Sequence, residues 1–244
     1  MRLILICVLL SAYGLPFRLV AQQAVTFPAK DGLTVTADLF LQNKESPYIV
    51  LCHLAGHSRG EYRETARRLN LMGYNCLAVD ARSGNEVLGV INQTAQRARE
   101  QNKRADYLDA EPDIVAAIAY ADSLGNRKGV ILLGSSYSAA LALKIGTVNR
   151  RVKAVLAFSP GKYFGEKLSL KQYIRSFNKP LFVTSSKEEA TKVALLIKDI
   201  QSPVKRHFVP AGKGAHGSIA LWKVTPNHAE YWTALEAFLK QLKL

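Results

Sequence analysis

Cysteine is scarce in this chain of 244 residues, which contains three. Two of them, Cys52 and Cys76, stand inside apolar runs, and because free cysteine is among the most buried residue types we expect two packed thiols. A disulfide is the alternative in an oxidising compartment, but Cys52 falls at the end of its expected strand and Cys76 near the start of the next. Cys52, His53 and His57 also lack a familiar metal-ligand spacing, so we expect neither a metal site nor a cofactor.

Long apolar runs are also missing. The run Leu3–Leu10 follows a positively charged start and is short for a membrane span, which needs about 20 residues. It suits the core of a signal peptide, and Ala21 is a small residue at a cleavage position. We therefore expect residues 1–21 to be an export signal and residues 22–244 to form the mature periplasmic or extracellular protein; an uncleaved anchor is the alternative.

Acidic residues are outnumbered, with 19 Asp and Glu against 33 Lys and Arg, and the formal net charge is +14. Removing Arg2 and Arg18 of the leader, which holds no acid, lowers it to +12. Such an excess would suit an acidic partner. The basic residues are scattered, however, and their densest cluster, Gln96–Arg104, has no interleaved aromatic residues. We therefore expect no nucleic-acid binding.

Turn and breaker residues divide the rest of the chain into strands and helices. Apolar and polar residues alternate on both sides of Asp31-Gly32, which predicts an antiparallel hairpin. Continuous apolar runs predict strands buried on both faces, and the helices between them end at a glycine or begin with a proline. We expect strands at Val25–Ala29, Leu33–Leu41, Tyr48–Leu54, Asn75–Asp80, Gly129–Leu133, Val152–Phe158, Leu181–Thr184 and Val204–Val209. We expect helices at Glu61–Met72, Pro112–Leu124, Ala139–Ile145, Leu168–Phe177, Glu188–Ile200 and His228–Leu242.

Strand followed by helix recurs at least five times after the hairpin. This alternation predicts one α/β domain: a three-layer sandwich with a mostly parallel central sheet, an N-terminal antiparallel hairpin and helices on both faces. Ligands bind beyond the carboxyl ends of strands in such sheets, so functional residues are expected in the strand-to-helix turns. The polar segment Ser83–Ala105 is expected to overhang that site and to influence specificity.

The stretch GVILLGSSYSAALAL, Gly129–Leu143, passes from an apolar strand to an apolar helix through a turn of small residues. A nucleophile on such a sharp turn is lifted above the sheet, and the residues two before and two after it must be small because their backbones nearly touch. Around Ser136 these are Gly134 and Ser138, so Ser136 is the predicted nucleophile. An alternative register has Ser138 as the nucleophile, and a phosphate-cradling or merely tight turn is a further interpretation.

A serine hydroxyl needs a base, and the base is expected on the loop after the last strand. That loop, VPAGKGAHGS, places His216 between Gly214 and Gly217, which is hard to explain as core packing. His207 lies inside an expected strand and His228 near the start of the last helix. His216 is therefore the predicted base, with an ordinary exposed loop histidine as the alternative.

The base needs an acid, and the stretch LFVTSSKEEA after the preceding strand carries two glutamates. Glutamate can replace aspartate because its task is to accept the imidazole N–H and stabilise the imidazolium. From its distance past the strand we predict Glu188 as the acid, with Glu189 as the alternative. Either could instead be a charge at the N-terminus of a helix.

An ester hydrolase also needs two backbone N–H groups that bind the developing oxyanion. One is expected from Tyr137, the residue after the nucleophile. The other is expected from the turn after the third strand, CHLAGHSRGEY, where either Leu54 or Ala55 can supply it. The nearby Glu61 is expected to be a charge in the first turn of a helix.

With these motifs the chain resembles the α/β-hydrolase family, and more narrowly its small, lidless, dienelactone-hydrolase-like members. The resemblance covers nearly all of the chain after the leader and rests on HLAGHSRGEY, VDARSG, GSSYS, TSSKEE and GKGAHGS. It implies Ser136 as nucleophile, His216 as base and Glu188 as acid. It also implies that Asp80 and Arg82 are structural and shape a turn beside the site.

Three features depart from the family pattern. Dienelactone hydrolases commonly use a cysteine nucleophile where this chain has Ser136, the expected acid is a glutamate, and Ser138 replaces the second glycine of the turn. Only Ser159–Lys167 separates the sixth strand from the next helix, which is too short for a helical lid. An open site suits soluble, accessible esters.

We therefore expect an exported serine hydrolase, a carboxylesterase acting on small or sugar-linked esters. Its partner would be a small-molecule ester substrate, with no nucleic acid and with membrane contact only through the export signal. A catalytically inactive binding protein on the same fold is one alternative. An amide or peptide hydrolase is another, because the machinery is shared.

Overall fold

The computed structural model describes residues 21–125 and 127–242. The predicted export signal, residues 1–21, lies outside the described residues except for Ala21, which begins the first strand. Among the helices that are described, none has both the length and the apolar character to cross a membrane.

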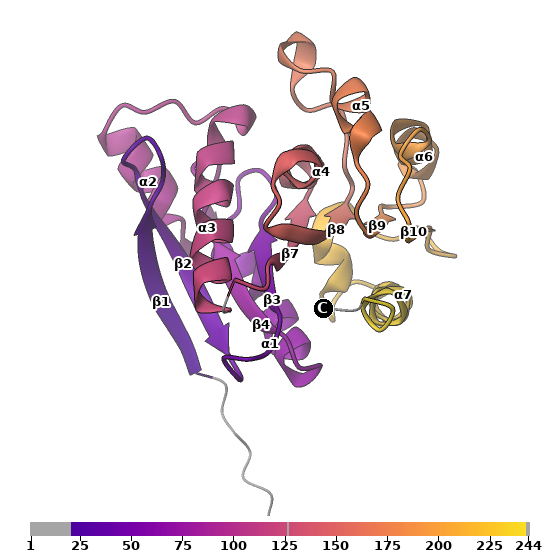
Figure 1. Ribbon diagram of the computed structural model, residues 1–244, viewed down its shortest axis with the longest axis horizontal. Helices are drawn as coiled ribbons and strands as arrows, with labels where there is room; N and C mark the ends of the chain where they lie inside the picture. Colours follow the sequence, from indigo (N-terminus) through magenta and orange to yellow (C-terminus); the bar gives the residue numbers. More distant parts are fainter. Residues whose placement is uncertain (1–20, 126, 243–244) are drawn as a thin grey trace, which may run out of the picture.

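An eight-stranded sheet forms the centre of the molecule, in the order β1-β2-β4-β3-β7-β8-β9-β10 (Figure 1). β1 and β2 form the predicted antiparallel hairpin, β2 is also antiparallel to β4, and the remaining neighbours are parallel. The strands are β1 (Ala21–Pro28), β2 (Thr34–Leu41), β3 (Tyr48–Cys52), β4 (Asn75–Val79), β7 (Val130–Ser135), β8 (Val152–Phe158), β9 (Leu181–Thr184) and β10 (Lys205–Phe208).

Helices cover both faces of this sheet, which confirms the predicted three-layer α/β sandwich (Figure 1). One face carries α1 (Arg63–Leu71) and α7 (His228–Leu239), and the other carries α3 (Glu111–Leu124), α4 (Tyr137–Val148), α5 (Leu170–Tyr173) and α6 (Ala190–Ile197). Strand side chains alternate between the two cores: in β3, Ile49 and Leu51 face one, and Val50 and Cys52 face the other. The continuous apolar runs reflect this double burial.

Two predicted segments differ from the structure. The polar segment after β4 contains a small hairpin, β5 (Glu86–Val87) and β6 (Val90–Ile91), then α2 (Gln93–Glu100) and a 3₁₀ turn, Tyr107–Ala110. The predicted helix Leu168–Phe177 is reduced to α5 and a 3₁₀ turn, Ile174–Ser176. Short elements of this kind depend on tertiary contacts more than on propensity, because isolated helices of few residues are marginal in water.

Both thiols within the described chain, Cys52 and Cys76, are free and fully buried, as predicted. Burial raises the pKa of each thiol above its ordinary value, because a thiolate is poorly solvated in the core. Neither is therefore a reactive group.

Candidate active site

Ser136 occupies the turn between β7 and α4 with φ 60° and ψ −120°. A positive φ is strained for a residue with a side chain, and such strain is concentrated at functional sites. The Ser136 N–H donates to the Phe158 carbonyl oxygen at 2.8 Å, which holds the turn against β8. The strand, the strained turn and the helix therefore follow one another directly, as the sequence pattern predicts.

Gly134 and Ser138, two residues before and two after Ser136, meet different structural requirements. A Cβ atom on Gly134 would lie 2.3 Å from the Ser138 carbonyl oxygen, so the position requires glycine. The Ser138 side chain points back into the protein, where its hydroxyl accepts from the Ser135 N–H at 2.8 Å and lies 2.7 Å from the Cys52 carbonyl oxygen. Ser138 is fully buried, which argues against the alternative register.

His216 lies beside Ser136, although the two are far apart in the sequence. Its Nε2 is 2.8 Å from Ser136 Oγ, and its Nδ1 is 2.6 Å from Glu189 Oε1. The following Gly217 has a φ of +71°, and a Cβ atom there would lie 2.6 Å from Ser135 Oγ. The glycine after His216 thus allows its loop to approach the turn of Ser136 closely.

The carboxylate that contacts His216 is Glu189, the alternative, and the structure places Glu188 elsewhere. Glu188 is exposed to solvent, whereas Glu189 is partly buried. Glu189 Oε2 accepts from the Ser186 N–H at 3.1 Å, from Ser186 Oγ at 2.9 Å and from Ser159 Oγ at 2.8 Å. Neighbouring residues on a turn point in different directions, so only one of the two glutamates can face the loop of His216.

Hydrogen bonding sets the protonation of this pair. Burial alone would raise the pKa of Glu189, but hydrogen bonds from His216, Ser159 and Ser186 outweigh it and lower the pKa to about 2. The hydrogen bond to Glu189 raises the pKa of His216, against the opposing effect of burial. The ionised carboxylate keeps the proton on Nδ1, so Nε2 of the neutral ring can accept the Ser136 proton.

Ser159 is a part of the site that sequence reasoning missed. It follows β8, is almost fully buried and has a positive φ of 54°. Its hydroxyl donates to Glu189 and accepts from the Gly217 N–H at 2.9 Å, so it links Glu189 to the loop of His216. Its position just after the carboxyl end of a buried strand was the available signal.

The two candidates for the second oxyanion donor differ in the structure. The Leu54 N–H donates to Glu61 Oε2 at 3.0 Å, so of the two alternatives Leu54 has its N–H already engaged in this structure. For Ala55 no acceptor is found for the N–H within the described chain, and Tyr137 N–H, at the first position of α4, has no partner inside its own helix. Ala55 and Tyr137 stay the predicted donors.

Glu61 lies in the first turn of a short 3₁₀ helix, Arg59–Tyr62, as expected, but it also makes contacts that a helix charge does not require. Its side chain is fully buried, and it accepts from Leu54 N–H, from His57 Nδ1 at 3.0 Å and from the Ser218 hydroxyl. Ser218 lies two residues after His216. The spacing of His57 and Glu61, four residues apart, was the only hint of this arrangement in the sequence.

The residues that were weighed as metal ligands and set aside make other contacts. His53 donates from Nδ1 to the Leu54 carbonyl oxygen at 2.7 Å and accepts at Nε2 from the Ala81 N–H at 3.0 Å. Both ring nitrogens are thus occupied by the backbone. Over residues 21–125 and 127–242, no group of three or more His, Cys, Asp or Glu side chains could hold a metal ion.

Asp80 and Arg82 make structural contacts, as the resemblance implies. Asp80 accepts from the N–H groups of Arg59 and Gln93, each at 2.8 Å. Arg82 forms ion pairs of 2.7 Å with Asp113 and with Asp31 of the hairpin turn. These ion pairs join the turn after β4 to α3 and to the hairpin.

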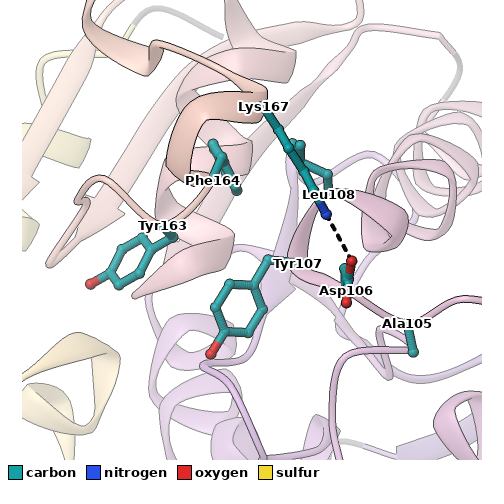
Figure 2. Close-up of a pocket in the computed structure, with 7 residues that line it drawn as sticks. All are labelled: Ala105, Asp106, Tyr107, Leu108, Tyr163, Phe164 and Lys167. Atoms are coloured by element: carbon teal, nitrogen blue, oxygen red, sulfur yellow. Dashed lines mark hydrogen bonds and ion pairs between the residues drawn. The ribbon is translucent and has the colours of Figure 1, made fainter.

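Two cavities meet at Tyr163, whose hydroxyl donates to the Ser159 carbonyl oxygen at 3.0 Å. The first has a volume of about 360 Å³ and lies between Tyr107 and the Tyr163–Lys167 segment (Figure 2). Tyr107 stacks on Tyr137 with ring centroids 4.7 Å apart. The second, of about 680 Å³, is lined by Glu189 and by α6. Only the last residue of the segment expected to overhang the site, Ala105, lines the first cavity.

The architecture and the turn at Ser136 are those of the α/β-hydrolase fold. Solved structures support this assignment. An esterase of Pyrococcus furiosus is similar with a TM-score of 0.68 and 19% identity, over 91% of this chain and 92% of that one. A dienelactone hydrolase of Anabaena variabilis has a TM-score of 0.68 and 15% identity, over 91% and 97%.

An acylaminoacyl peptidase of Pyrococcus horikoshii is also similar, with a TM-score of 0.64 and 18% identity, over 92% of this chain and 42% of that one. No family model matches the chain, and no curated protein matches it in sequence. At these identities the likeness establishes the fold and leaves the reaction to be argued from the residues.

Proposed function

We propose that this protein is a serine hydrolase that cleaves carboxylic esters, with Ser136 as nucleophile, His216 as base and Glu189 as acid. The observation that carries the proposal is the continuous hydrogen-bonded series from Ser136 through His216 to Glu189, with distances of 2.8 and 2.6 Å. A serine, a histidine and a carboxylate in this geometry define a catalytic triad by their roles.

The reaction follows from that geometry. Ser136 Oγ attacks the ester carbonyl carbon while its proton passes to His216 Nε2, and the carbonyl electrons move onto the oxygen. The N–H groups of Tyr137 and Ala55 bind this oxyanion. The C–O bond to the alcohol then breaks, and the leaving oxygen takes the proton from Nε2. Water repeats the sequence on the acyl-enzyme, which releases the acid and restores Ser136.

Two further features favour an ester as the substrate. The larger of the two cavities lined by Tyr163 is also lined by Glu189, so it offers space for part of an ester close to the proposed acid. Between β8 and α5 there is only a loop with one 3₁₀ turn, Gly165–Lys167, so this segment forms no helical lid. An open site suits small or sugar-linked esters. Esterases are also among the similar structures.

The decisive test compares the parent with Ser136→Ala on p-nitrophenyl acetate. The parent should turn over, and the variant should lose a factor on the order of 10⁴ or more in kcat with an unchanged circular dichroism spectrum. A fluorophosphonate probe should label the parent at Ser136 and leave the variant unlabelled. A folded parent that is neither active nor labelled would support a catalytically inactive binding protein instead.

Amide hydrolysis is the second candidate, because an acylaminoacyl peptidase is among the similar structures and the same triad serves both reactions. Matched p-nitrophenyl ester and p-nitroanilide substrates with the same acyl group separate the two. A kcat/KM for the anilide equal to that for the ester would favour the amide hydrolase.

We also infer export. The support is the positively charged start, the apolar run Leu3–Leu10 and the small residue Ala21. Mass spectrometry of the protein from the periplasm or medium of its host should find Gln22 as the first residue. Intact Met1 in the cytoplasmic fraction alone would contradict the inference.

A further inference from the structure

Glu61 is a buried carboxylate without a cationic Lys or Arg partner. Its side chain is 0% exposed, and His57 is the one group with which it forms an ion pair in the described chain. A carboxylate removed from water is costly unless hydrogen bonds compensate for the lost hydration. Here the compensation comes from three donors on two segments: Leu54 N–H and His57 Nδ1 on the loop after β3, and the Ser218 hydroxyl on the loop of His216.

The first of these donors orients the loop that follows β3. Glu61 holds the Leu54 N–H, and His53 Nδ1 holds the Leu54 carbonyl oxygen at 2.7 Å. The Leu54 carbonyl and the Ala55 N–H belong to one planar trans peptide, in which they point in opposite directions. Once the carbonyl is held toward His53, the direction of the Ala55 N–H is set. Glu61 holds the preceding peptide through the Leu54 N–H, so Glu61 and His53 together fix the backbone on both sides of Leu54, from which the Ala55 N–H projects.

The second segment is the loop of the base. The Ser218 hydroxyl donates to Glu61, and the Ser218 N–H donates to Ser135 Oγ at 2.8 Å. Ser218 is thus held both by Glu61 and by the residue before the nucleophile. Because His216 is only two residues away, the same contacts limit the movement of its ring relative to Ser136.

We propose that Glu61 is a positioning residue for the hydrolysis, in which one carboxylate holds the Leu54 backbone, from which the predicted oxyanion donor Ala55 N–H projects, and holds the His216 loop against the nucleophile turn. This inference rests on the proposed function. The inference extends that function, because Glu61 links the loop of the predicted oxyanion donor to the loop of His216, which the triad itself does not connect. The negative charge of Glu61 also contributes to the raised pKa of His216, behind the larger contribution of Glu189.

The test is Glu61→Gln, which keeps the shape of the side chain and removes its charge. Poorer orientation of the Ala55 N–H should weaken oxyanion binding, so kcat for p-nitrophenyl acetate should fall about 10- to 100-fold with little change in KM. A trifluoromethyl ketone forms an oxyanion when Ser136 adds to it, so its inhibition constant should rise by the same factor as kcat falls. A merely structural role would lower the amount of active enzyme, which fluorophosphonate titration measures, and leave both constants of the active fraction unchanged.

Glu64→Gln is the matched control, because Glu64 lies one turn further along, is exposed and, within the described residues, accepts from the Lys223 N–H alone. It should keep the parental constants. If Glu61→Gln does not fold, Ser218→Ala retains the carboxylate and removes one contact, and should show the same parallel change at smaller size.

Three outcomes are distinguishable. Parallel losses in kcat and ketone affinity support the inference. A Glu61→Gln enzyme whose active fraction matches the parent in both constants overturns it and leaves the proposed function standing. A parent that neither hydrolyses the ester nor binds the ketone overturns the proposed function, and this inference with it.

Discussion

Two glutamate–histidine pairs lie beyond the carboxyl ends of the parallel strands, and we assign them different roles. Glu189 contacts His216 Nδ1 at 2.6 Å, and Glu61 contacts His57 Nδ1 at 3.0 Å. The side chains of the first pair are 30% and 44% exposed, whereas Glu61 is fully buried and His57 is 25% exposed. Residue type and ring atom are therefore the same in both pairs, and their surroundings differ.

The difference lies at the second ring nitrogen and at the remaining carboxylate contacts. His216 Nε2 faces Ser136 Oγ, whereas the His57 ring stacks near Trp222 with centroids 6.4 Å apart. Glu61 uses its other contacts to hold the backbone of Leu54 and the loop after His216. We infer that a carboxylate–imidazole pair can transfer a proton only where a nucleophile lies within hydrogen-bond distance of the second ring nitrogen. Without a nucleophile, the pair stabilises the local structure.

The largest difference in activity is expected between variants of the two histidines. His216→Ala removes the base, so kcat for p-nitrophenyl acetate should fall by a factor on the order of 10⁴ or more. His57→Ala leaves the triad intact and should keep activity within about tenfold of the parent, since hydrogen bonds of this kind contribute modestly. Equal losses in the two variants would refute the assignment of different roles.

Replacing the glutamate of the first pair should have the next largest effect. Glu189→Gln leaves His216 without an anionic acceptor for Nδ1–H, and kcat/KM should fall by about 10³ to 10⁴. Glu188→Gln is the matched neighbour, exposed to solvent, and should keep the parental rate. If Glu188→Gln is the damaging change, the geometry found here is not the one used in turnover.

The free energy of unfolding should depend more on Glu61 than on Glu189, which is the opposite of the order expected for activity. Glu61→Gln disturbs a buried carboxylate with three donors and should lower the free energy of unfolding by about 1–3 kcal/mol. Glu189 is partly exposed, so Glu189→Gln should cost less, about 1 kcal/mol or below. Urea unfolding followed by circular dichroism measures both. A larger loss for Glu189→Gln would mean that burial is not what separates the pairs.

The smallest expected effect is on the pH profile. The base must be neutral, and Glu189 raises the pKa of His216 above its ordinary value of 6.5, so kcat/KM should rise with pH and level off only above that value. Glu189→Gln removes the charge that favours the imidazolium, so the rising limb should move to lower pH. A limb that stays in place in Glu189→Gln would show that the group titrating is not His216.

Local patterns were sufficient for the framework of this protein. Alternating and continuous apolar runs predicted the hairpin and the buried parallel strands, because the pattern of apolar residues within a strand shows whether one face or both faces are buried. The turn at Ser136 was equally visible, since it needs Gly134 for contact with the Ser138 backbone. His216 was visible because glycine allows its loop to approach that turn.

The choices that the sequence did not decide are of a different kind. Glu188 and Glu189 are adjacent and chemically identical, and the choice between them depends on the positions of Ser159 and Ser186. Leu54 and Ala55 are likewise adjacent, and the choice depends on a carboxylate seven residues later in the sequence. The short elements after β4 also escaped prediction, because contacts elsewhere in the molecule stabilise them.

The amino-acid sequence by itself determined the layered α/β architecture, the strained turn of Ser136 and the loop of His216. These features depend on burial, residue size and backbone freedom, which are properties of each segment. Only the tertiary structure decided that Glu189 contacts the base, that Ser159 links the two loops and that Glu61 holds both Leu54 and Ser218. The reason is that a hydrogen bond between distant segments depends on where the folded backbone brings them, to within fractions of an ångström, and no single segment encodes that distance.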